Sequence, residues 1–308
     1  SGSLGRPYTL EHILMTNGTF AGLAVALSAL VDPGDEVIFI SPPWFFYEAL
    51  IEAVGATPVR VNADRNTFDL DVDGVRAAIT PRTRGIIINS PNNPGGKIYS
   101  SETLTRLSEV LTGASETAGR PIYLFSDEAY KRIVFDGASY PSPTEFYGNS
   151  LLLYTYGKTL LTPGQRLGYI AITPGMPDAA EVAEALFLAQ TLTGWAFPNA
   201  LLQHALADIE KLSIDIAHLE RKRDRMVEAL TGAGYRVTIP EGTFYIVARS
   251  PWEDDLAFTK ALAGQDVYVL PGSTFELPGF FRISLTANDE MIERALPLFA
   301  EAIRQPAP

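Results

Sequence analysis

The most informative segment of this chain is Tyr154-Thr155-Tyr156-Gly157-Lys158-Thr159-Leu160-Leu161-Thr162-Pro163-Gly164-Gln165-Arg166-Leu167-Gly168-Tyr169. The apolar runs Leu151–Leu153 and Tyr169–Ile172, on either side of it, have the composition of buried strands. Glycine, proline and hydroxyl residues between these runs predict an irregular loop. Lys158 and Arg166 therefore lie in a short loop between two buried strands. Either both cations face solvent, as most do, or an anion lies between them, because burying unpaired charge is costly.

Three other predicted strands also end in polar or aromatic residues. Glu36–Ile40 runs into Ser41–Tyr47, Gly85–Asn89 into Ser90–Gly96, and Ile122–Phe125 into Ser126–Tyr130. Ligands of open α/β sheets bind at the carboxyl ends of the strands. Each feature also has an ordinary interpretation, as a core aromatic, a plain turn or a helix cap. The agreement of four strand ends nevertheless predicts one site that contains Trp44, Asn93, Asp127, Tyr130 and Lys158.

A possible anion site comes earlier in the chain, where Thr16-Asn17-Gly18-Thr19-Phe20 precedes a helical pattern of leucines. A glycine-containing turn at a helix N-terminus leaves free backbone N–H groups at the positive end of the helix dipole, and phosphate binds well there. The alternative is an ordinary cap of a core helix by Asn17 or Thr19. The pattern by itself does not decide between the two.

The composition indicates a packed globular protein. The chain has 308 residues, of which 46% are hydrophobic, enough for one large domain and a smaller one. It has no cysteine, so we expect neither disulfides nor a metal site built on thiolates, and we predict no metal among the site residues. The net charge of −12 argues against nucleic acid or a membrane surface as partner, and no apolar run is long enough to span a membrane. Because Ser1–Leu10 lacks the pattern of a signal peptide, we expect a cytoplasmic protein.

The predicted elements change in character along the chain. Strands and helices alternate as far as the strand at Tyr169–Ile172, with one predicted helix at Ser100–Leu111. Two further predicted helices follow that strand, at Pro177–Gln190 and Pro198–Leu230. Short strands then dominate, with two further helices at Leu256–Ala263 and Asp289–Ile303. The predicted strands are Tyr235–Thr238, Thr243–Val247, Val267–Leu270 and Phe281–Ser284. We predict a large α/β domain over residues 1–221 and a smaller α+β domain over residues 222–308.

Four motifs together resemble the class I/II aminotransferases, enzymes of pyridoxal phosphate (PLP) fold type I. Thr155 and Lys158, followed by Arg166 and Gly-Tyr, resemble the family's cofactor-lysine segment. Further matches are Asn92–Gly96 with its Asn-Asn-Pro-Thr-Gly, Ser126–Tyr130 with its Ser-Asp-Glu-x-Tyr, and Phe281–Ser284 with its Arg-x-Ser strand. The resemblance runs in order from about Thr16 to the end. It implies a large domain with a mixed, mostly parallel sheet between helices, a small C-terminal domain, and a homodimer with shared active sites.

The resemblance also implies a role for each motif residue. Lys158 would hold PLP as an internal aldimine, and Asp127 would keep the ring nitrogen protonated. Asn93 and Tyr130 would contact the ring O3′. Trp44 would stack on the ring face. The phosphate would be bound by Gly18, Thr19, Phe20, Thr155 and Arg166, and the substrate α-carboxylate by Arg282 beside Asn93.

The implied reaction moves an amino group between an α-amino acid and a 2-keto acid. PLP acts as an electron sink for the Cα carbanion, and the amine of Lys158 is the natural base for the proton of Cα. A lyase, cyclase or amino-acid oxidase would use the same cofactor site. A further alternative is a non-catalytic ligand-sensing domain of this fold, as in some transcription regulators. The acidic net charge disfavours this alternative, because such regulators bind DNA.

The chain departs from the family pattern at several positions. Gly95 replaces the usual threonine, and Thr155 stands for a usual serine. Only about fifteen residues precede Gly18, so we expect the family's N-terminal arm to be short or missing, with Tyr8 a poor substitute for the arm's tyrosine. No second substrate-binding arginine is recognisable. Phe20, Trp195 and Phe197 either line a substrate pocket or belong to the core.

Overall fold

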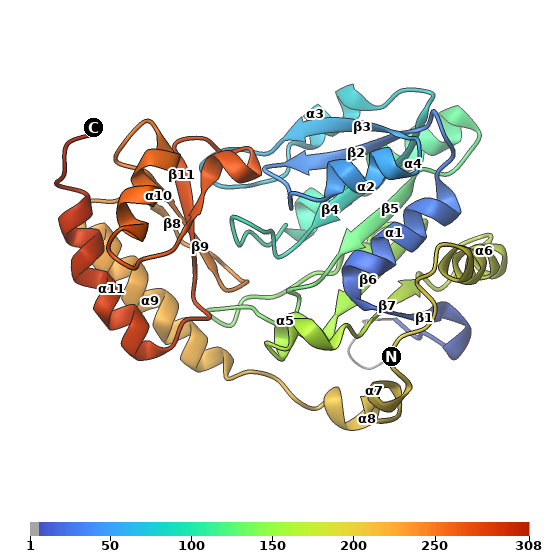
Figure 1. The fold of residues 1–308 in the computed structure, drawn as a ribbon. Coiled ribbons are helices and arrows are strands. Elements are labelled where there is room, and N and C mark those ends of the chain that lie inside the picture. The colour runs from blue at the N-terminus through green and yellow to red at the C-terminus, as the bar shows by residue number, and fades with distance from the viewer. Residues whose placement is uncertain (1–5, 308) are drawn as a thin grey trace.

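The computed structural model describes residues 6–307. The first half of Ser1–Leu10, the segment predicted not to be a signal peptide, therefore lies outside the described residues. Figure 1 shows a large part built on a seven-stranded sheet and a smaller part with a four-stranded sheet, at opposite ends of the molecule. Within residues 6–307, no helix is long and apolar enough to cross a membrane. The cytoplasmic location stays a prediction.

The large sheet is mixed and mostly parallel, as predicted. Its strand order is β1-β7-β6-β5-β4-β2-β3, and only β7 runs against its neighbours. Parallel register pairs Asn89 with Asp127 at the ends of β4 and β5, which brings these two side chains to the same edge. The strands are β1 Ile13–Thr16, β2 Glu36–Ser41, β3 Thr57–Asn62, β4 Thr83–Asn89, β5 Tyr123–Asp127, β6 Ser150–Thr155 and β7 Gly168–Ile172.

Helices cover both faces of this sheet, which explains why its central strands are apolar throughout. Ile87 of β4 packs on the face covered by α1, α2 and α6, whereas Ile86 and Ile88 pack on the face covered by α3 and α4. The helices are α1 Gly18–Leu30, α2 Tyr47–Ala53, α3 Val72–Ala78, α4 Ser101–Ala118 and α6 Ala179–Leu192. Beside β6 and β7, the second face is covered by α7 Ala200–His204 and α8 Leu206–Ile209.

The smaller part is an antiparallel sheet with helices packed on it. The sheet order is β10-β11-β9-β8, and α9 lies alongside α11 at the outer edge of the molecule (Figure 1). The elements are α9 Ile216–Ala233, β8 Val237–Thr238, β9 Tyr245–Arg249, α10 Asp255–Ala263, β10 Leu270–Pro271, β11 Phe280–Ser284 and α11 Asp289–Ala302. The domain boundary at residue 222 stays a prediction, since α9 runs unbroken through it.

Three element predictions were wrong in extent. The helix predicted over Pro198–Leu230 is broken into α7, α8 and α9, because the side chain of Asp215 caps α9 by accepting from the N–H of His218 at 2.8 Å. The strand predicted at Val267–Leu270 pairs with β11 only from Leu270. The helix predicted to end near Leu111 continues to Ala118, where Gly119 ends it in the left-handed conformation.

Short one-turn elements complete the fold: η1 Leu10–His12, η2 Pro143–Glu145, α5 Tyr156–Thr159, η3 Pro163–Gln165 and η4 Gly272–Phe275. The residue after η4, Glu276, joins the two parts of the molecule. Its carboxylate accepts from Arg60 at 2.8 Å and from the hydroxyl of Ser41 at 2.7 Å. Phe68 of the large part packs into an apolar cluster with Val247 and Phe275 of the small part. These contacts hold β11, which carries Arg282, at the edge of the large sheet.

Candidate active site

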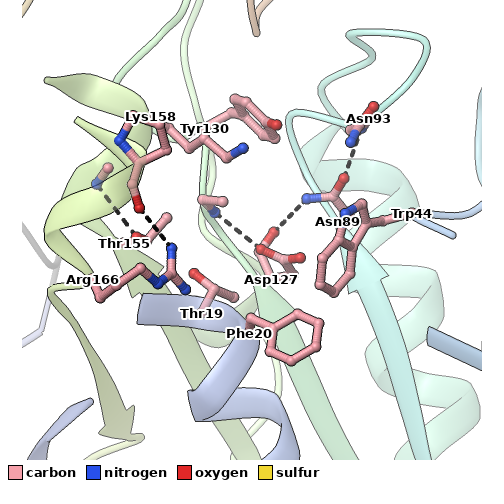
Figure 2. A pocket seen from close by; sticks show the side chains of 13 residues that line it. Thr19, Phe20, Trp44, Asn89, Asn93, Asp127, Tyr130, Thr155, Lys158 and Arg166 are labelled. Carbon is pink, nitrogen blue, oxygen red and sulfur yellow. Dashed lines mark hydrogen bonds between the residues drawn. The ribbon is translucent and has the colours of Figure 1, made fainter. Parts of the chain in front are cut away.

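A pocket opens at the carboxyl ends of the central strands (Figure 2). It collects side chains that follow β2, β4, β5 and β6, together with the start of α1. Its lining residues are Thr19, Phe20, Trp44, Asn89, Asn93, Asp127, Ala129, Tyr130, Thr155, Gly157, Lys158, Pro163 and Arg166. The pocket therefore brings together every predicted site residue except Gly18 and Arg282, which lie at its borders.

Lys158 extends into the pocket from α5, the single turn that follows β6. Thr155 caps this turn, because its hydroxyl accepts from the N–H of Gly157 at 3.3 Å. The Nζ atom of Lys158 lies 5.4 Å from the centroid of the Tyr130 ring and 5.8 Å from that of Phe244. The amine is thus held over aromatic faces. It forms no ion pair with a carboxylate among the described residues.

Asp127 is a buried carboxylate at the end of β5 that faces the pocket. It accepts from the hydroxyl of Tyr47 at 2.7 Å and from the N–H of Ala129 at 3.2 Å. Burial raises the pKa of Asp127, while these two donors and the charge of Lys158 oppose the rise. Burial likewise raises the pKa of Tyr47 well above its usual value, so Tyr47 stays protonated and donates.

Two residues of this arrangement were not predicted, Tyr47 and Asn89. Asn89 donates to the backbone oxygen of Asp127 at 2.8 Å and accepts from the N–H of Asn93 at 2.7 Å. It therefore fixes the loop after β4 to the end of β5. A signal was available for Asn89, since it is a polar residue that ends an apolar strand. Tyr47 gave only an aromatic signal within the run that contains Trp44.

Arg282 lies beside the pocket, and its guanidinium group forms no ion pair with a carboxylate in the part of the chain that the structure describes. It donates to the side-chain oxygen of Asn93 at 2.7 Å. Its Cζ atom lies 3.9 Å from the centroid of the Tyr245 ring and 5.8 Å from that of Phe275. Burial lowers the pKa of Arg282, which the nearby Tyr245 and Tyr130 partly oppose. A half-buried cation without a carboxylate partner among residues 6–307 is suited to bind an anionic ligand group.

A cradle for an anion forms where α1 begins. Gly18 has a φ of +84°, and a Cβ atom there would lie 2.9 Å from Nη2 of Arg166 and 3.2 Å from Oγ1 of Thr155. The hydroxyl of Thr19 is buried and has no hydrogen-bond partner among the described residues. Arg166 is oriented by the backbone oxygens of Asn17 at 2.9 Å and Pro163 at 3.0 Å. An unpartnered hydroxyl, an arginine and a helix N-terminus together fit a phosphate group.

The ring-contact residues predicted from the sequence line the same pocket. Tyr130 is buried, its pKa is raised well above the usual value by burial, and its ring packs edge-on against Phe244. Trp44 packs against Phe20 and Tyr47. Tyr8 packs instead behind β6 and β7 and does not line the pocket. The pocket thus offers a carboxylate, an amine, a flat aromatic wall and an anion cradle, which are the groups that PLP requires.

The structure also explains why Gly95 stands where the family has threonine. A Cβ atom at Gly95 would lie 2.2 Å from Cγ of Phe68. Phe68 is fully buried between the two parts of the molecule, so it has no room to move away. The glycine is therefore a packing consequence of Phe68 and changes no side chain that lines the pocket.

Comparison with known proteins places these features in a family. The family model described as aminotransferase class I and II matches residues 4–298. The chain belongs to this family. It is therefore an aminotransferase of a family that uses PLP, and the predicted family, fold, activity and cofactor are confirmed. The lyase, cyclase and oxidase alternatives and the non-catalytic alternative are set aside.

The relatives of this aminotransferase match along nearly its whole length. A probable aspartate/prephenate aminotransferase of Thermus aquaticus is 30% identical, with 97% of this chain and 78% of the relative covered. An aminotransferase structure from Eubacterium rectale is 36% identical with a TM-score of 0.93, covering 98% of this chain and 76% of that one. The N-succinyldiaminopimelate aminotransferase of Mycobacterium tuberculosis is 27% identical with a TM-score of 0.86, covering 97% and 79%.

Proposed function

We propose that this aminotransferase uses Lys158 to hold PLP and to move the proton of the substrate's Cα as it transfers the amino group to a 2-keto acid. One observation carries the proposal: Lys158, Asp127 and the cradle of Thr19, Thr155 and Arg166 line a single pocket. When bound, PLP supplies an electron sink for negative charge at the substrate Cα.

The protein's own groups divide the remaining work. Asp127, held by Tyr47, would keep the ring nitrogen of bound PLP protonated, and its burial would strengthen that interaction. Trp44 supplies a flat wall for the ring, and Asn93 and Tyr130 supply polar contacts at its edge. In the first half-reaction the Lys158 amine takes the proton from Cα of the amino acid. In the second half-reaction it returns a proton to Cα, as the 2-keto acid becomes the product amino acid.

We assign the substrate α-carboxylate to Arg282. Its guanidinium group packs on the ring of Tyr245, and one N–H is already directed by Asn93. A planar fork binds a carboxylate through two parallel hydrogen bonds, which a lysine does not reproduce. Arg282 comes from the small part of the molecule, so closing the two parts on each other would bury the bound substrate.

We also propose a homodimer with shared active sites. Large apolar side chains are exposed together on α6 and on the segment that follows it, and the rings of Phe187 and Phe197 stack at 5.9 Å. Soluble monomers seldom expose a contiguous apolar patch of this kind. The exposed side chains are Phe187, Leu188, Leu192, Phe197 and Leu201. Sedimentation of the purified protein should give twice the mass of one chain, and a charge introduced by Leu192→Glu should give single chains.

The half-reaction is the direct test of the proposed function. Purified protein is loaded with PLP, freed of excess cofactor, and mixed with single amino acids in the absence of any keto acid. Aspartate belongs in the panel, because it appears in the names of several relatives. We expect the visible absorption band of the bound cofactor to bleach with release of one equivalent of keto acid per site. A protein that takes up no cofactor, or whose band persists with every amino acid, would contradict the proposal.

A further inference from the structure

The ring of Tyr245 in β9 packs against the guanidinium group of Arg282, which we assigned to the substrate α-carboxylate. The Cζ atom of Arg282 lies 3.9 Å from the centroid of that ring. At this distance the guanidinium group lies over the face of the ring, because the atoms of the ring's edge would keep it farther away. The face of an aromatic ring attracts a cation. A guanidinium group stacked on a ring keeps its in-plane N–H donors free for the two oxygens of a carboxylate.

The pairing of β9 with β11 accounts for this contact. In the antiparallel register, Tyr245 is opposite Ser284 and Arg282 is opposite Val247. Arg282 and Tyr245 are therefore diagonal neighbours on one face of the sheet, within reach of a long side chain and an aromatic one. The backbone N–H of Tyr245 also donates to the hydroxyl of Thr243 at 3.1 Å. Sheet pairing and this hydrogen bond together fix the backbone that carries the ring.

Other aromatic side chains restrain the Tyr245 ring itself. Its centroid lies 6.0 Å from that of Tyr130 and 4.8 Å from that of Phe244, edge-on in both cases. Arg282 in turn donates to Asn93, on the loop after β4, at 2.7 Å. All of these contacts form within one chain, between elements that lie far from α6 in Figure 1. The arginine is thus held between a restrained ring and a fixed loop.

Arg282 depends on this support, because little else orders its long side chain. Among residues 6–307 its guanidinium group makes one hydrogen bond, to Asn93, and no ion pair. A second ring, that of Phe275, is more distant, at 5.8 Å. Ordering an arginine side chain costs much of its rotamer freedom. If the free protein did not supply that order, the substrate carboxylate would have to impose it on binding, and affinity would fall.

We propose that Tyr245 is a positioning residue for the substrate α-carboxylate, and that its ring, not its hydroxyl, holds Arg282 in the orientation that binds. The inference rests on the proposed function, since it concerns the carboxylate of the same substrate. Tyr245 does not line the pocket, so it acts through Arg282. The ring and the hydroxyl can be removed separately, which makes the assignment open to test.

The half-reaction, run with the amino acid that reacts best in the panel, measures this role. Tyr245→Leu removes the ring, and we expect the half-saturating concentration of amino acid to rise by about tenfold, the scale of a partly desolvated cation–π contact. The maximal rate should change by less than about threefold, because the carboxylate is bound alike in the ground state and the transition state. Tyr245→Phe keeps the ring, so its half-saturating concentration should stay within about twofold of the unmodified value.

Two results of this comparison would overturn the inference. One is an unchanged half-saturating concentration in Tyr245→Leu. The other is an equal rise in Tyr245→Phe, which would assign the role to the hydroxyl. Tyr268→Leu is the matched control, because Tyr268 belongs to the same small part, is 79% exposed and does not line the pocket. A rise in Tyr268→Leu as large as that in Tyr245→Leu would also overturn it.

A double substitution separates positioning from a general structural role. In the Arg282→Gln background there is no guanidinium group for the ring to hold. Adding Tyr245→Leu to that background should therefore change kcat/KM of the half-reaction by less than about twofold. A loss as large as in the unmodified background would show that Tyr245 does not act through Arg282.

Crystal structures of the two variants give a readout that does not depend on activity. We expect the hydrogen bond from Arg282 to Asn93 to persist in Tyr245→Phe and to be lost in Tyr245→Leu. Arg282 still bound to Asn93 in Tyr245→Leu would overturn the inference. The proposed function fails separately, if no amino acid bleaches the cofactor band of the unmodified protein. A reactive panel with an unaffected Tyr245→Leu would remove the inference alone.

Discussion

Asp127 and Glu128 are neighbours at the end of β5, yet they serve opposite faces of the sheet. Asp127 lines the active-site pocket, whereas Glu128 lines a second cavity of about 270 Å³ that also contains Lys131 and Arg132. Both carboxylates are buried, and burial raises the pKa of each. A raised pKa alone therefore does not distinguish the functional residue from its neighbour.

The difference lies in how each charge is satisfied. Glu128 accepts from Ser142 at 2.6 Å and from Ser126 at 3.1 Å, and Lys131 lies 3.8 Å away as its counter-ion. Among residues 6–307, Asp127 has only the neutral donors Tyr47 and Ala129, with Lys158 acting across the pocket. A buried carboxylate without an adjacent counter-ion, facing an open pocket, is what a cationic ligand atom requires. Four substitutions test this contrast.

The largest effect should come from Lys158→Ala. Removing the amine removes both the cofactor attachment and the base, so we expect kcat of the half-reaction to fall by at least about 10⁴-fold. Stopped-flow absorption with the best amino acid measures the rate. The matched control is Lys211→Ala, an exposed lysine outside the pocket. Residual activity above about one hundredth of the unmodified rate would exclude Lys158 as the base.

Asp127→Asn should lower kcat by about 10³-fold, because the neutral amide no longer keeps the ring nitrogen protonated in a buried site. The same half-reaction assay measures this loss. The protein should remain folded, since asparagine preserves the shape of the side chain and accepts from Tyr47. A kcat within about threefold of the unmodified enzyme would contradict the assigned role.

The pH dependence of stability gives this variant an independent readout. The folded-state pKa of Asp127 is raised, so its ionised form destabilises the cofactor-free protein at pH values above that pKa. Asp127→Asn should therefore raise the free energy of unfolding of the cofactor-free protein at neutral pH. The gain should fade as the pH falls toward the ordinary aspartate pKa, where both states bind the proton. Urea titrations at several pH values measure it, and a loss of stability at neutral pH would contradict the account.

Glu128→Leu should act on stability instead of catalysis. It leaves Lys131 buried without its counter-ion, which should lower the free energy of unfolding by about 3 kcal/mol. The double substitution Glu128→Leu with Lys131→Met should recover most of that loss. Denaturant titrations measure both. A fall in kcat comparable to that of Asp127→Asn would show that the two carboxylates are not functionally distinct.

The smallest effect should come from Tyr47→Phe, which removes one hydrogen bond to Asp127. We expect kcat to fall by about tenfold, the scale of a hydrogen bond to a charged group. In the Asp127→Asn background the same change should have almost no effect, because Tyr47 acts through that carboxylate. Additive losses in the two backgrounds would show that Tyr47 acts elsewhere.

Much of the site was predictable because its signals are local. Asn93, Asp127 and Lys158 each follow an apolar run, and parallel strands bring their carboxyl ends to one edge. The hydrogen bond of Tyr47 to Asp127 was not predictable, because it depends on how α2 packs against β5, across a separation of 80 residues. The contact of Arg282 with Asn93 spans 189 residues, and only the family resemblance suggested that the two would meet.

The errors in the fold have equally specific causes. Leucines and alanines between Pro198 and Leu230 follow a helical pattern, but the cap at Asp215 starts a new helix that joins the second core. Val267–Leu270 is rich in strand-forming residues. It follows Asp266 at positive φ, and the N–H of Val267 donates to Leu262, so this segment closes α10 before pairing begins.

The central claim is that Lys158 holds the cofactor, and peptide mapping after reduction tests it most directly. Protein loaded with PLP is treated with borohydride, digested, and analysed by mass spectrometry for the lysine that carries the added pyridoxyl phosphate. We predict the modification on Lys158 at one per chain, with Lys131, a lysine that follows the neighbouring strand β5, unmodified. A modification on another lysine, or none on Lys158, would contradict the account.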